Sequence, residues 1–330
     1  MWTLDELEPQ IDEVRSRILT HGRDLKEYFV GRDTEIDLAL LCAVAQEPLL
    51  MVGPPGTAKS DLVVKFTESL GLEQDDYFEY MLTKFTEPSE ILGPIDIDLL
   101  KKGRYVRRTA GMLPTARVAF LDEIFKSNSA ILNTLLTILN ERKFYQDGKP
   151  EKVNLIMLFA ATNEIPEQTE LEAMADRFVI KVETNPVKDT HFTELVDAGI
   201  MNEAYKATGR KPWARGSASF DDFLKFKRFM DLTFGLDFER GADRARWFPR
   251  SVFAEMRRIV RALETEDKVF VSDRKLVKIY KLIRTRAFLM HGGAVETSDL
   301  ELLAYVGNHR HELSVVSEKV HALLGLSRAG

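Results

Sequence analysis

Apolar residues in the first half of the chain follow two alternating patterns. Five short apolar runs have the length of buried strands. Between them, apolar residues recur every three or four positions, which indicates amphipathic helices. Strands that alternate with helices favour a parallel sheet covered on both faces, so we expect an α/β fold with a five-stranded parallel sheet. The predicted strands are residues 49–52, 76–82, 117–121, 153–161 and 178–182.

The pattern changes after Asn185-Pro186, where helical periodicity takes over and continues to the end of the chain. We expect a loop at 209–217, a longer break at 235–249 and only a weak strand signal at 269–271. The N-terminal segment 4–28 also has helical spacing, interrupted near Gly22. The sequence therefore predicts an α/β domain over residues 1–185 and an all-α domain over residues 186–330.

A glycine-rich segment joins the first predicted strand to the helix that follows it. Such a loop aims several backbone N–H groups at a bound anion, and the helix N-terminus adds partial positive charge. The segment is typical of a P-loop, with Lys59 at the terminal phosphates of a nucleotide and Ser60 as a magnesium ligand. The residues expected to surround the nucleotide are Gly53, Pro54, Pro55, Gly56, Thr57, Ala58, Lys59, Ser60 and Asp61.

One residue departs from the general P-loop pattern, which has glycine immediately before the lysine. Here that position holds Ala58. A methyl group is tolerable there if the residue has helical dihedral angles, so we expect Ala58 to be helical.

Two adjacent carboxylates, Asp122 and Glu123, follow the third predicted strand. Buried strands avoid charge, so this pair next to a P-loop needs a chemical reason. We expect Asp122 to help hold magnesium through water, and Glu123 to orient and deprotonate the attacking water. Asn163 closes the next strand and could position that water or sense the γ-phosphate. An ordinary turn residue is the alternative for Asn163.

Two arginines could complete such a site from elsewhere. Arg177 precedes the fifth strand, far along the sheet from the P-loop, so it could serve the nucleotide of a neighbouring subunit rather than its own. Arg250 opens a helix of the second domain and could reach a γ-phosphate across the cleft between domains. Taken alone, each arginine fits a surface salt bridge better.

Composition narrows the class of protein further. Hydrophobic residues make up 45% and charged residues 30% of the chain, as in ordinary globular proteins. The net charge of −6 argues against broad coating of nucleic acid. Cys42, the single cysteine, excludes an internal disulfide and fits a small buried hydrophobe. The acidic N-terminus lacks a signal-peptide pattern and no apolar run reaches membrane-span length, so we expect a cytoplasmic protein.

Together these motifs resemble the AAA+ ATPases, and within them the MoxR family. The resemblance is specific over residues 28–183, and from 186 onward it depends mainly on Pro249-Arg250. The motif strings are closest to the RavA-like subgroup, although the chain is too short for the further domain that follows the lid of RavA. The strings that carry the resemblance are the P-loop and residues 85–94, 109–114, 120–126, 131–142 and 161–163.

The resemblance implies roles that spacing alone does not show. It implies ATP and Mg²⁺ as cofactors, and a ring of subunits that we expect to be a hexamer. Arg177 would be an arginine finger acting in trans. Asn163 would be sensor 1 and Arg250 sensor 2, while Val30 and Gly31 would contact the adenine.

The resemblance also implies a helix-2 insert at about 87–107 and a hairpin before sensor 1 at about 143–152, both facing the central pore. The implied work is chaperone-like remodelling or maturation of a protein, often one with a von Willebrand factor A domain. One alternative is a DNA-directed AAA+ machine, because replicative helicases carry similar inserts, but the acidic charge argues against it. The other is a nucleotide-gated scaffold with little turnover, which the carboxylate pair argues against.

Overall fold

The computed structural model describes residues 2–166, 169–239 and 244–326. Five parallel strands form one sheet in the order β2-β3-β6-β1-β7, which confirms the predicted fold class. β1 lies between β6 and β7, so Leu49 is opposite both Phe159 and Ile180. The strands of this sheet are β1 (Leu49–Val52), β2 (Tyr77–Met81), β3 (Val118–Asp122), β6 (Met157–Thr162) and β7 (Ile180–Glu183).

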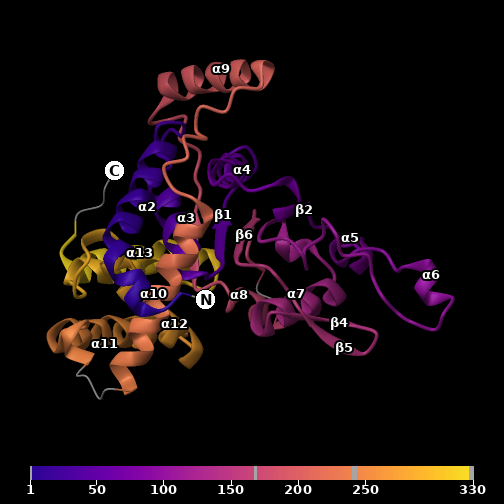
Figure 1. The fold of residues 1–330 in the computed structure, drawn as a ribbon. Helices are drawn as coiled ribbons and strands as arrows, with labels where there is room; N and C mark the ends of the chain where they lie inside the picture. The colour runs from indigo at the N-terminus through magenta and orange to yellow at the C-terminus, as the bar shows by residue number, and fades with distance from the viewer. Residues whose placement is uncertain (1, 167–168, 240–243, 327–330) are drawn as a thin grey trace.

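Both faces of the sheet are buried, as expected of parallel strands. All four residues of β1 are buried, and they alternate between two hydrophobic cores: Leu49 and Met51 join one, Leu50 and Val52 the other. Helices cover the sheet (Figure 1). The helices up to β7 are α1 (Leu4–Leu7), α2 (Ile11–Lys26), α3 (Asp33–Ala45), α4 (Lys59–Ser69), α5 (Pro88–Leu92), α6 (Ile97–Leu100), α7 (Ser129–Glu141) and α8 (Thr169–Ala175). Short 3₁₀ turns are η1 (Glu8–Gln10), η2 (Gln74–Asp76) and η3 (Ile124–Lys126).

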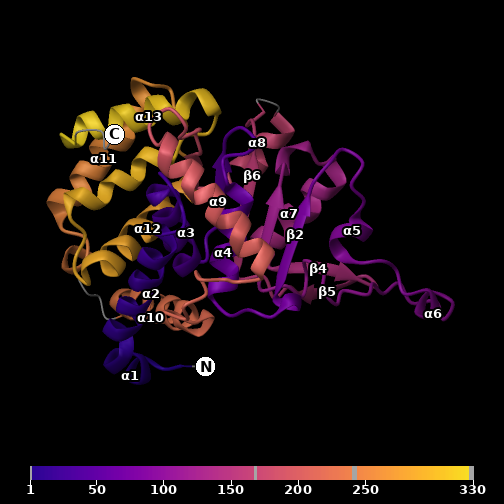
Figure 2. The ribbon, with the colours of Figure 1, turned by 90° about the horizontal axis from the view of Figure 1, so that it is seen from above.

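The described chain after β7 is helical, as predicted. Its helices are α9 (Phe192–Thr208), α10 (Phe220–Glu239), η4 (Arg244–Arg246), α11 (Arg250–Thr265), α12 (Asp273–His291), η5 (Thr297–Tyr305) and α13 (Arg310–Leu324). Apolar side chains of α10 and α12, among them Phe223 and Ile279, share one core with the N-terminal helices α2 and α3. Figure 2 shows α10, α2, α3 and α12 gathered at the same end of the molecule.

Several local expectations are wrong. Gly22 lies inside the unbroken helix α2, where an added Cβ would approach Leu40 to 3.1 Å, and the interruption falls instead at the 3₁₀ turn that contains Pro9. Residues 269–271 form no strand. α10 runs through the first part of the predicted break as far as Glu239. Residues 240–243 of that break lie outside the described residues.

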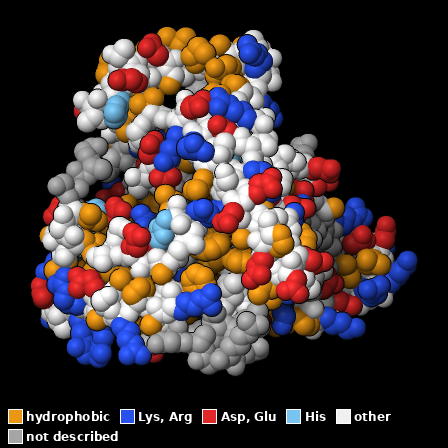
Figure 3. Space-filling view, turned by 60° about the vertical axis from the view of Figure 1, so that its left-hand side comes forward, with side chains coloured by type: hydrophobic (Ala, Val, Ile, Leu, Met, Phe, Trp, Pro, Cys, Tyr) orange, Lys and Arg blue, Asp and Glu red, His pale blue; other side chains and the backbone are white. Residues whose placement is uncertain are grey.

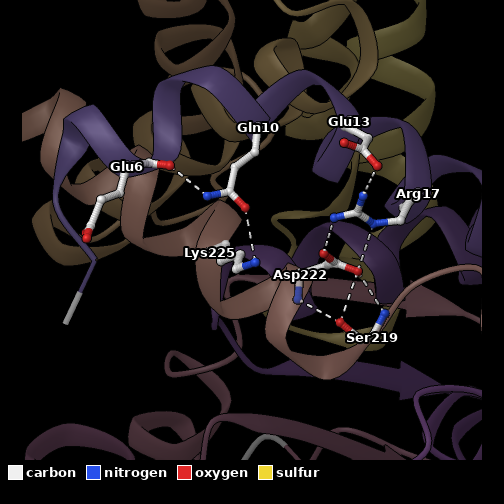
Figure 4. A network of polar contacts seen from close by, with 7 residues as sticks. All are labelled: Glu6, Gln10, Glu13, Arg17, Ser219, Asp222 and Lys225. Atoms are coloured by element: carbon white, nitrogen blue, oxygen red, sulfur yellow. Dashed lines mark hydrogen bonds and ion pairs between the residues drawn. The ribbon is translucent and has the colours of Figure 1, made fainter.

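A polar network fixes α10 against the N-terminal segment (Figure 4). Arg17 donates to both carboxylate oxygens of Asp222, at 2.6 and 3.2 Å, and also to Glu13. Ser219 donates to the same Asp222, and Lys225 donates to Gln10. Because the Asp222 side chain is only 6% exposed, this pair is screened less than a surface ion pair. The network therefore joins the helical half of the chain to its N-terminus.

Two segments project from the sheet (Figures 1 and 2). One is the stretch that carries α5 and α6. The other is the antiparallel hairpin of β4 (Lys143–Gln146) and β5 (Lys149–Lys152). Tyr105 and Asp147 join the two segments through hydrogen bonds of 3.0 and 2.9 Å. Among the residues that the structure describes, no helix is both long and apolar enough for a membrane crossing.

Candidate nucleotide site

The glycine-rich loop lies where β1 meets α4, at the C-terminal end of the central strand. Gly53 N donates to Thr162 O of β6 at 3.0 Å, and Thr184 N, just after β7, donates to Val52 O at 2.8 Å. A Cβ on Gly53 would lie 2.2 Å from Thr184 O, so only glycine fits this close approach. The sheet therefore fixes the start of the loop on both sides.

Ala58 does not have the helical dihedral angles that we expected. Its φ of 63° and ψ of 21° lie in the left-handed region, one residue before α4 begins at Lys59. A residue with a Cβ pays roughly 1–2 kcal/mol for this conformation, which is why glycine is usual there. The expectation was wrong because the loop must turn through the left-handed region to place the next amides at the helix N-terminus.

Lys59 folds back over its own loop. Its Nζ donates to Gly53 O at 2.7 Å and to Pro54 O at 2.9 Å, and its side chain is buried. Burial lowers the pKa of Lys59, and the nearby carboxylates Asp122 and Glu123 oppose that shift. The ammonium is thus bonded to neutral carbonyl oxygens, while two acidic groups lie close enough to act on its charge.

Asp122, Glu123 and Asn163 meet at the ends of the adjacent strands β3 and β6. Asn163 Nδ2 donates to Glu123 Oε1 at 2.6 Å, and Lys126 Nζ donates to the same oxygen at 2.9 Å. Glu123 Oε2 is buried, and no described residue gives it a hydrogen bond. A buried carboxylate oxygen without a partner is costly unless another molecule uses it. Glu123 is therefore held through one oxygen and available for proton transfer through the other.

The site fits a triphosphate with a divalent cation. Ser60 is exposed at the N-terminus of α4, where backbone N–H groups and the helix dipole favour an anion. Asp122 lies at the end of β3, which β6 separates from β1, and accepts a bond from the Glu123 amide through Oδ1. A hydroxyl and a carboxylate are oxygen donors of the kind that Mg²⁺ prefers beside phosphates.

A pocket of about 250 Å³ opens beside the loop. Gly56, Thr57, Ala58 and Asp61 line one side, and Val30 lines another. Gly31 lines a neighbouring polar hollow instead. Gly53, Pro54, Pro55 and Ser60 do not line the pocket, although they belong to the same loop and helix start.

Helix α9 covers this pocket, which the sequence analysis did not predict. Leu195, Ala198, Gly199 and Asn202 of α9 line it. The buried Lys65 of α4 holds the helix there, because its Nζ donates to Asn202 Oδ1 and Asp61 Oδ2, both at 2.8 Å. A charged residue inside the apolar stripe of α4 was the signal that could have indicated this contact.

The structure places Arg177 and Arg250 away from the pocket lining. Arg177 lies between α8 and β7, and its buried Nε has no hydrogen-bond partner among the described residues. The preceding Asp176 accepts from Ser272 of the α12 N-terminus at 3.1 Å and lies 3.9 Å from Lys275 Nζ. Arg250 is the first residue of α11 and is exposed.

Arg310 contacts the Asn163 segment, which the sequence analysis also missed. This first residue of α13 donates to Asn163 O at 3.2 Å. The N-termini of α12 and α13 thus reach both the segment that carries Arg177 and the one that carries Asn163.

Comparison with known proteins agrees with this geometry. The model of the MoxR domain in the MoxR-vWA-beta-propeller ternary systems matches residues 16–217. An AAA lid domain model matches residues 251–319. These two matches cover the P-loop, the sheet and most of the helical part that follows.

Similar proteins come from several organisms. An uncharacterised protein of Methanocaldococcus jannaschii is 34% identical over 90% of this chain and 71% of its own length. Chaperone MoxR1 of Mycobacterium tuberculosis is 23% identical over 62% of this chain and 52% of its own. A solved structure from Cytophaga hutchinsonii, named as a candidate ATPase, superposes with a TM-score of 0.71 at 17% identity and covers 98% of both chains, which shows the fold.

AAA+ membership implies nucleotide binding with a divalent metal, in agreement with the donor groups described above. The chain belongs to the MoxR family of AAA+ ATPases, with an α/β nucleotide-binding fold and a helical AAA lid.

Proposed function

We propose that this protein hydrolyses the β–γ bond of ATP and uses the reaction to remodel a partner protein. The observation that carries the proposal is the state of Glu123, whose Oε1 is fixed by Asn163 and Lys126 while Oε2 is buried without a described partner. This is the arrangement expected of a general base that takes a proton from an attacking water.

The other residues of the site have supporting roles in this proposal. Lys59 binds the terminal phosphates, and the amides from Gly53 to Ser60 surround them. Ser60 and Asp122 would hold Mg²⁺, which when bound neutralises phosphate charge. Asn163 keeps Glu123 oriented. Val30 and Gly31 would contact the adenine, Val30 from within the pocket lining.

We propose that the active species is a ring, expected to be a hexamer, in which subunits share sites. Arg177 would act in trans as the arginine finger, and Arg250 would be sensor 2. The support is that Arg177 keeps a buried Nε without a described partner. A guanidinium supplied by a neighbour can raise phosphoryl transfer by about 10³–10⁵-fold.

The projecting segments at 87–107 and 143–152 are proposed as the client-binding elements. Large apolar side chains are exposed there, including Ile97, Tyr105 and Tyr145, beside basic residues such as Arg104. The matching family model is named after MoxR-vWA-beta-propeller systems, and one relative is named a chaperone. We therefore propose a client with a von Willebrand factor A domain. The cytoplasmic location, the RavA-like subgroup and the domain division at residue 186 stay predictions from the sequence.

Replacing Glu123 by Gln tests the proposal directly. The E123Q protein should bind ATP with affinity similar to wild type, while its turnover falls by about 10²–10⁴-fold because the base is lost. Turnover is measured by phosphate release, and binding with a fluorescent ATP analogue. Glu79→Gln, an exposed acid on the neighbouring strand β2, is the matched control and should keep full activity.

Three outcomes would contradict the proposal. Unchanged turnover in E123Q would remove the assignment of the base. Strong stimulation of ATPase activity by DNA, with a steep salt dependence, would favour the DNA-directed alternative. Very slow turnover in the wild-type ring would favour the nucleotide-gated scaffold.

A further inference from the structure

Helix α9 presents an apolar stripe to solvent. Phe192, Val196 and Ile200 recur every fourth residue and are 69%, 46% and 62% exposed. No described residue of this 17-residue helix is buried. Figure 3 shows hydrophobic side chains gathered at the top of the molecule, where Figure 1 places α9. A contiguous exposed apolar stripe of this kind marks an interaction surface.

The stripe lies on a different side of α9 from most of the residues that line the nucleotide pocket. Leu195, Ala198 and Asn202 point toward the pocket, and residues four apart share one face of a helix, so the stripe lies on another side. Asp197 and Glu203 are exposed: Asp197 lies beside the stripe, and Glu203 continues it at the C-terminal end, three residues after Ile200. The outer face of α9 is therefore apolar, with one acidic residue beside the stripe and one at its C-terminal end.

The lid carries a surface of the opposite character. A hollow of about 590 Å³ lies between α11 and α12, and the apolar side chains of Met256, Val260, Leu276 and Val277 line it. Leu276 is 39% and Val277 is 56% exposed. Arg257 and Arg261 stand one turn apart on α11, both exposed and both lining the hollow. We call this surface the lid groove.

The two surfaces match but are far apart within one chain. An apolar stripe with two acidic residues beside it and at its end complements an apolar groove that two arginines and one glutamate, Glu264, also line. α9 lies at one end of the molecule and α11 at the other (Figure 1). The same chain therefore cannot fill its own groove in this conformation, whereas a second copy presents α9 from outside.

We infer that α9 of one copy docks into the lid groove of a second copy. Stripe and groove are different patches, so the contact is head-to-tail and closes into a ring if the rotation between copies allows it. The inference rests on the proposed ring and names the surfaces that build it. Because the inner side of α9 lines the nucleotide pocket, nucleotide occupancy in one copy acts directly on the element that its neighbour binds.

Site-directed disulfide formation tests this contact. Cys42 is buried in α3, so the native chain supplies no competing exposed thiol. I200C protein is mixed with V277C protein in the presence of a non-hydrolysable ATP analogue and Mg²⁺, and then mildly oxidised. We expect covalent dimers from the mixture on a non-reducing gel, and a ladder of larger species from the double variant I200C/V277C.

The matched control pairs I200C with V315C, an exposed position of similar size on α13 that lies outside the lid groove. Equal dimer yield from this control, or from I200C alone, would overturn the inference. Reversing the charge of both arginines, in R257E/R261E, should weaken assembly. Analytical ultracentrifugation should show that at least a tenfold higher protein concentration is needed for assembly. Mixing R257E/R261E with D197R/E203R should restore assembly, because each reversed surface then meets its opposite charge. If the mixture associates no better than either variant alone, this result counts against the contact.

The inference and the proposed function fail in different ways. If the disulfide is absent but mixed wild-type and R177A subunits still inhibit one another, the ring forms through another surface and only the inference is lost. If the wild-type chain stays monomeric with nucleotide at every concentration, the proposed ring itself is wrong.

Discussion

The loop at the tip of the sheet and helix α9 lie on two sides of the same pocket, yet they are built in opposite ways. At the tip, Lys59 is only 8% exposed and its ammonium is bonded within its own loop. On α9, Ile200 is 62% exposed and no described residue is buried. The loop side of the pocket is thus packed and hydrogen-bonded within the chain. The α9 side exposes an apolar surface that the chain itself does not cover.

The difference indicates where the site is rigid and where it can move. The tip is fixed by backbone bonds from β6 and β7 and by close packing around Gly53. α9 has few buried apolar contacts, and segments of this kind open at low free energy. We therefore expect the phosphate grip to be preformed, the covering of the pocket to depend on α9, and the completion of catalysis to depend on a neighbouring subunit.

The strongest test of this comparison is Arg177→Ala. This variant removes the guanidinium that we propose one subunit supplies to the nucleotide site of its neighbour. We expect turnover to fall by about 10³-fold or more, because the charge on the transferring phosphoryl group loses its guanidinium. Nucleotide binding by the same protein should change little, since Arg177 does not line its own pocket. Phosphate release and binding of a fluorescent nucleotide measure the two effects.

Mixing makes the test specific for a shared site. When R177A subunits are titrated into wild-type protein, activity should fall more steeply than the wild-type fraction. Arg23→Ala, an exposed arginine on α2, serves as the matched control and should dilute activity in simple proportion. A proportional decrease with R177A as well would mean that each chain works alone.

The sequence predicted the preformed side of the pocket well and the uncovered side poorly. Lys59, Asp122, Glu123 and Asn163 follow or precede short apolar strands, so their place at one sheet edge follows from topology alone. The role of α9 could not be predicted this way, because its contacts depend on how the chain returns after β7. Arg310 is a similar case: it reaches Asn163 O across 147 positions of sequence.

A buried charge behind the pocket gives the next largest expected effect. Lys181 of β7 is 1% exposed, and its Nζ donates to Phe178 O at 2.8 Å. Burial lowers the pKa of Lys181 well below its usual value, and the neighbouring Lys275 adds to the shift. Replacing Lys181 by Met should therefore raise the free energy of unfolding at pH 7, because the folded state no longer has to bury that charge.

The stability that K181M gains over the wild type should shrink as the pH rises toward 10. Between the lowered pKa of the folded state and the ordinary pKa of the unfolded state, the unfolded chain binds more protons at this lysine. Wild-type stability therefore rises with pH in that window, while K181M lacks this contribution. Urea denaturation at pH 7 and pH 9.5 measures the difference, with the exposed Lys102→Met as control. A gain that is equal at both pH values would show that Lys181 keeps its proton in the folded state up to pH 9.5, so that its pKa is not lowered.

The smallest expected effect concerns Ala58, at the boundary between the rigid tip and the pocket. Its left-handed backbone costs roughly 1–2 kcal/mol, which glycine would avoid. Glycine also gains freedom in the unfolded chain, which costs about 0.4–1 kcal/mol. The first term is larger, so Ala58→Gly should stabilise the protein by about 0.5–1 kcal/mol. Ala254→Gly, exposed inside α11, lacks the strain and should instead destabilise by about 1 kcal/mol. If both variants lose stability equally, Ala58 is not strained, and the tip is held less tightly than its contacts indicate.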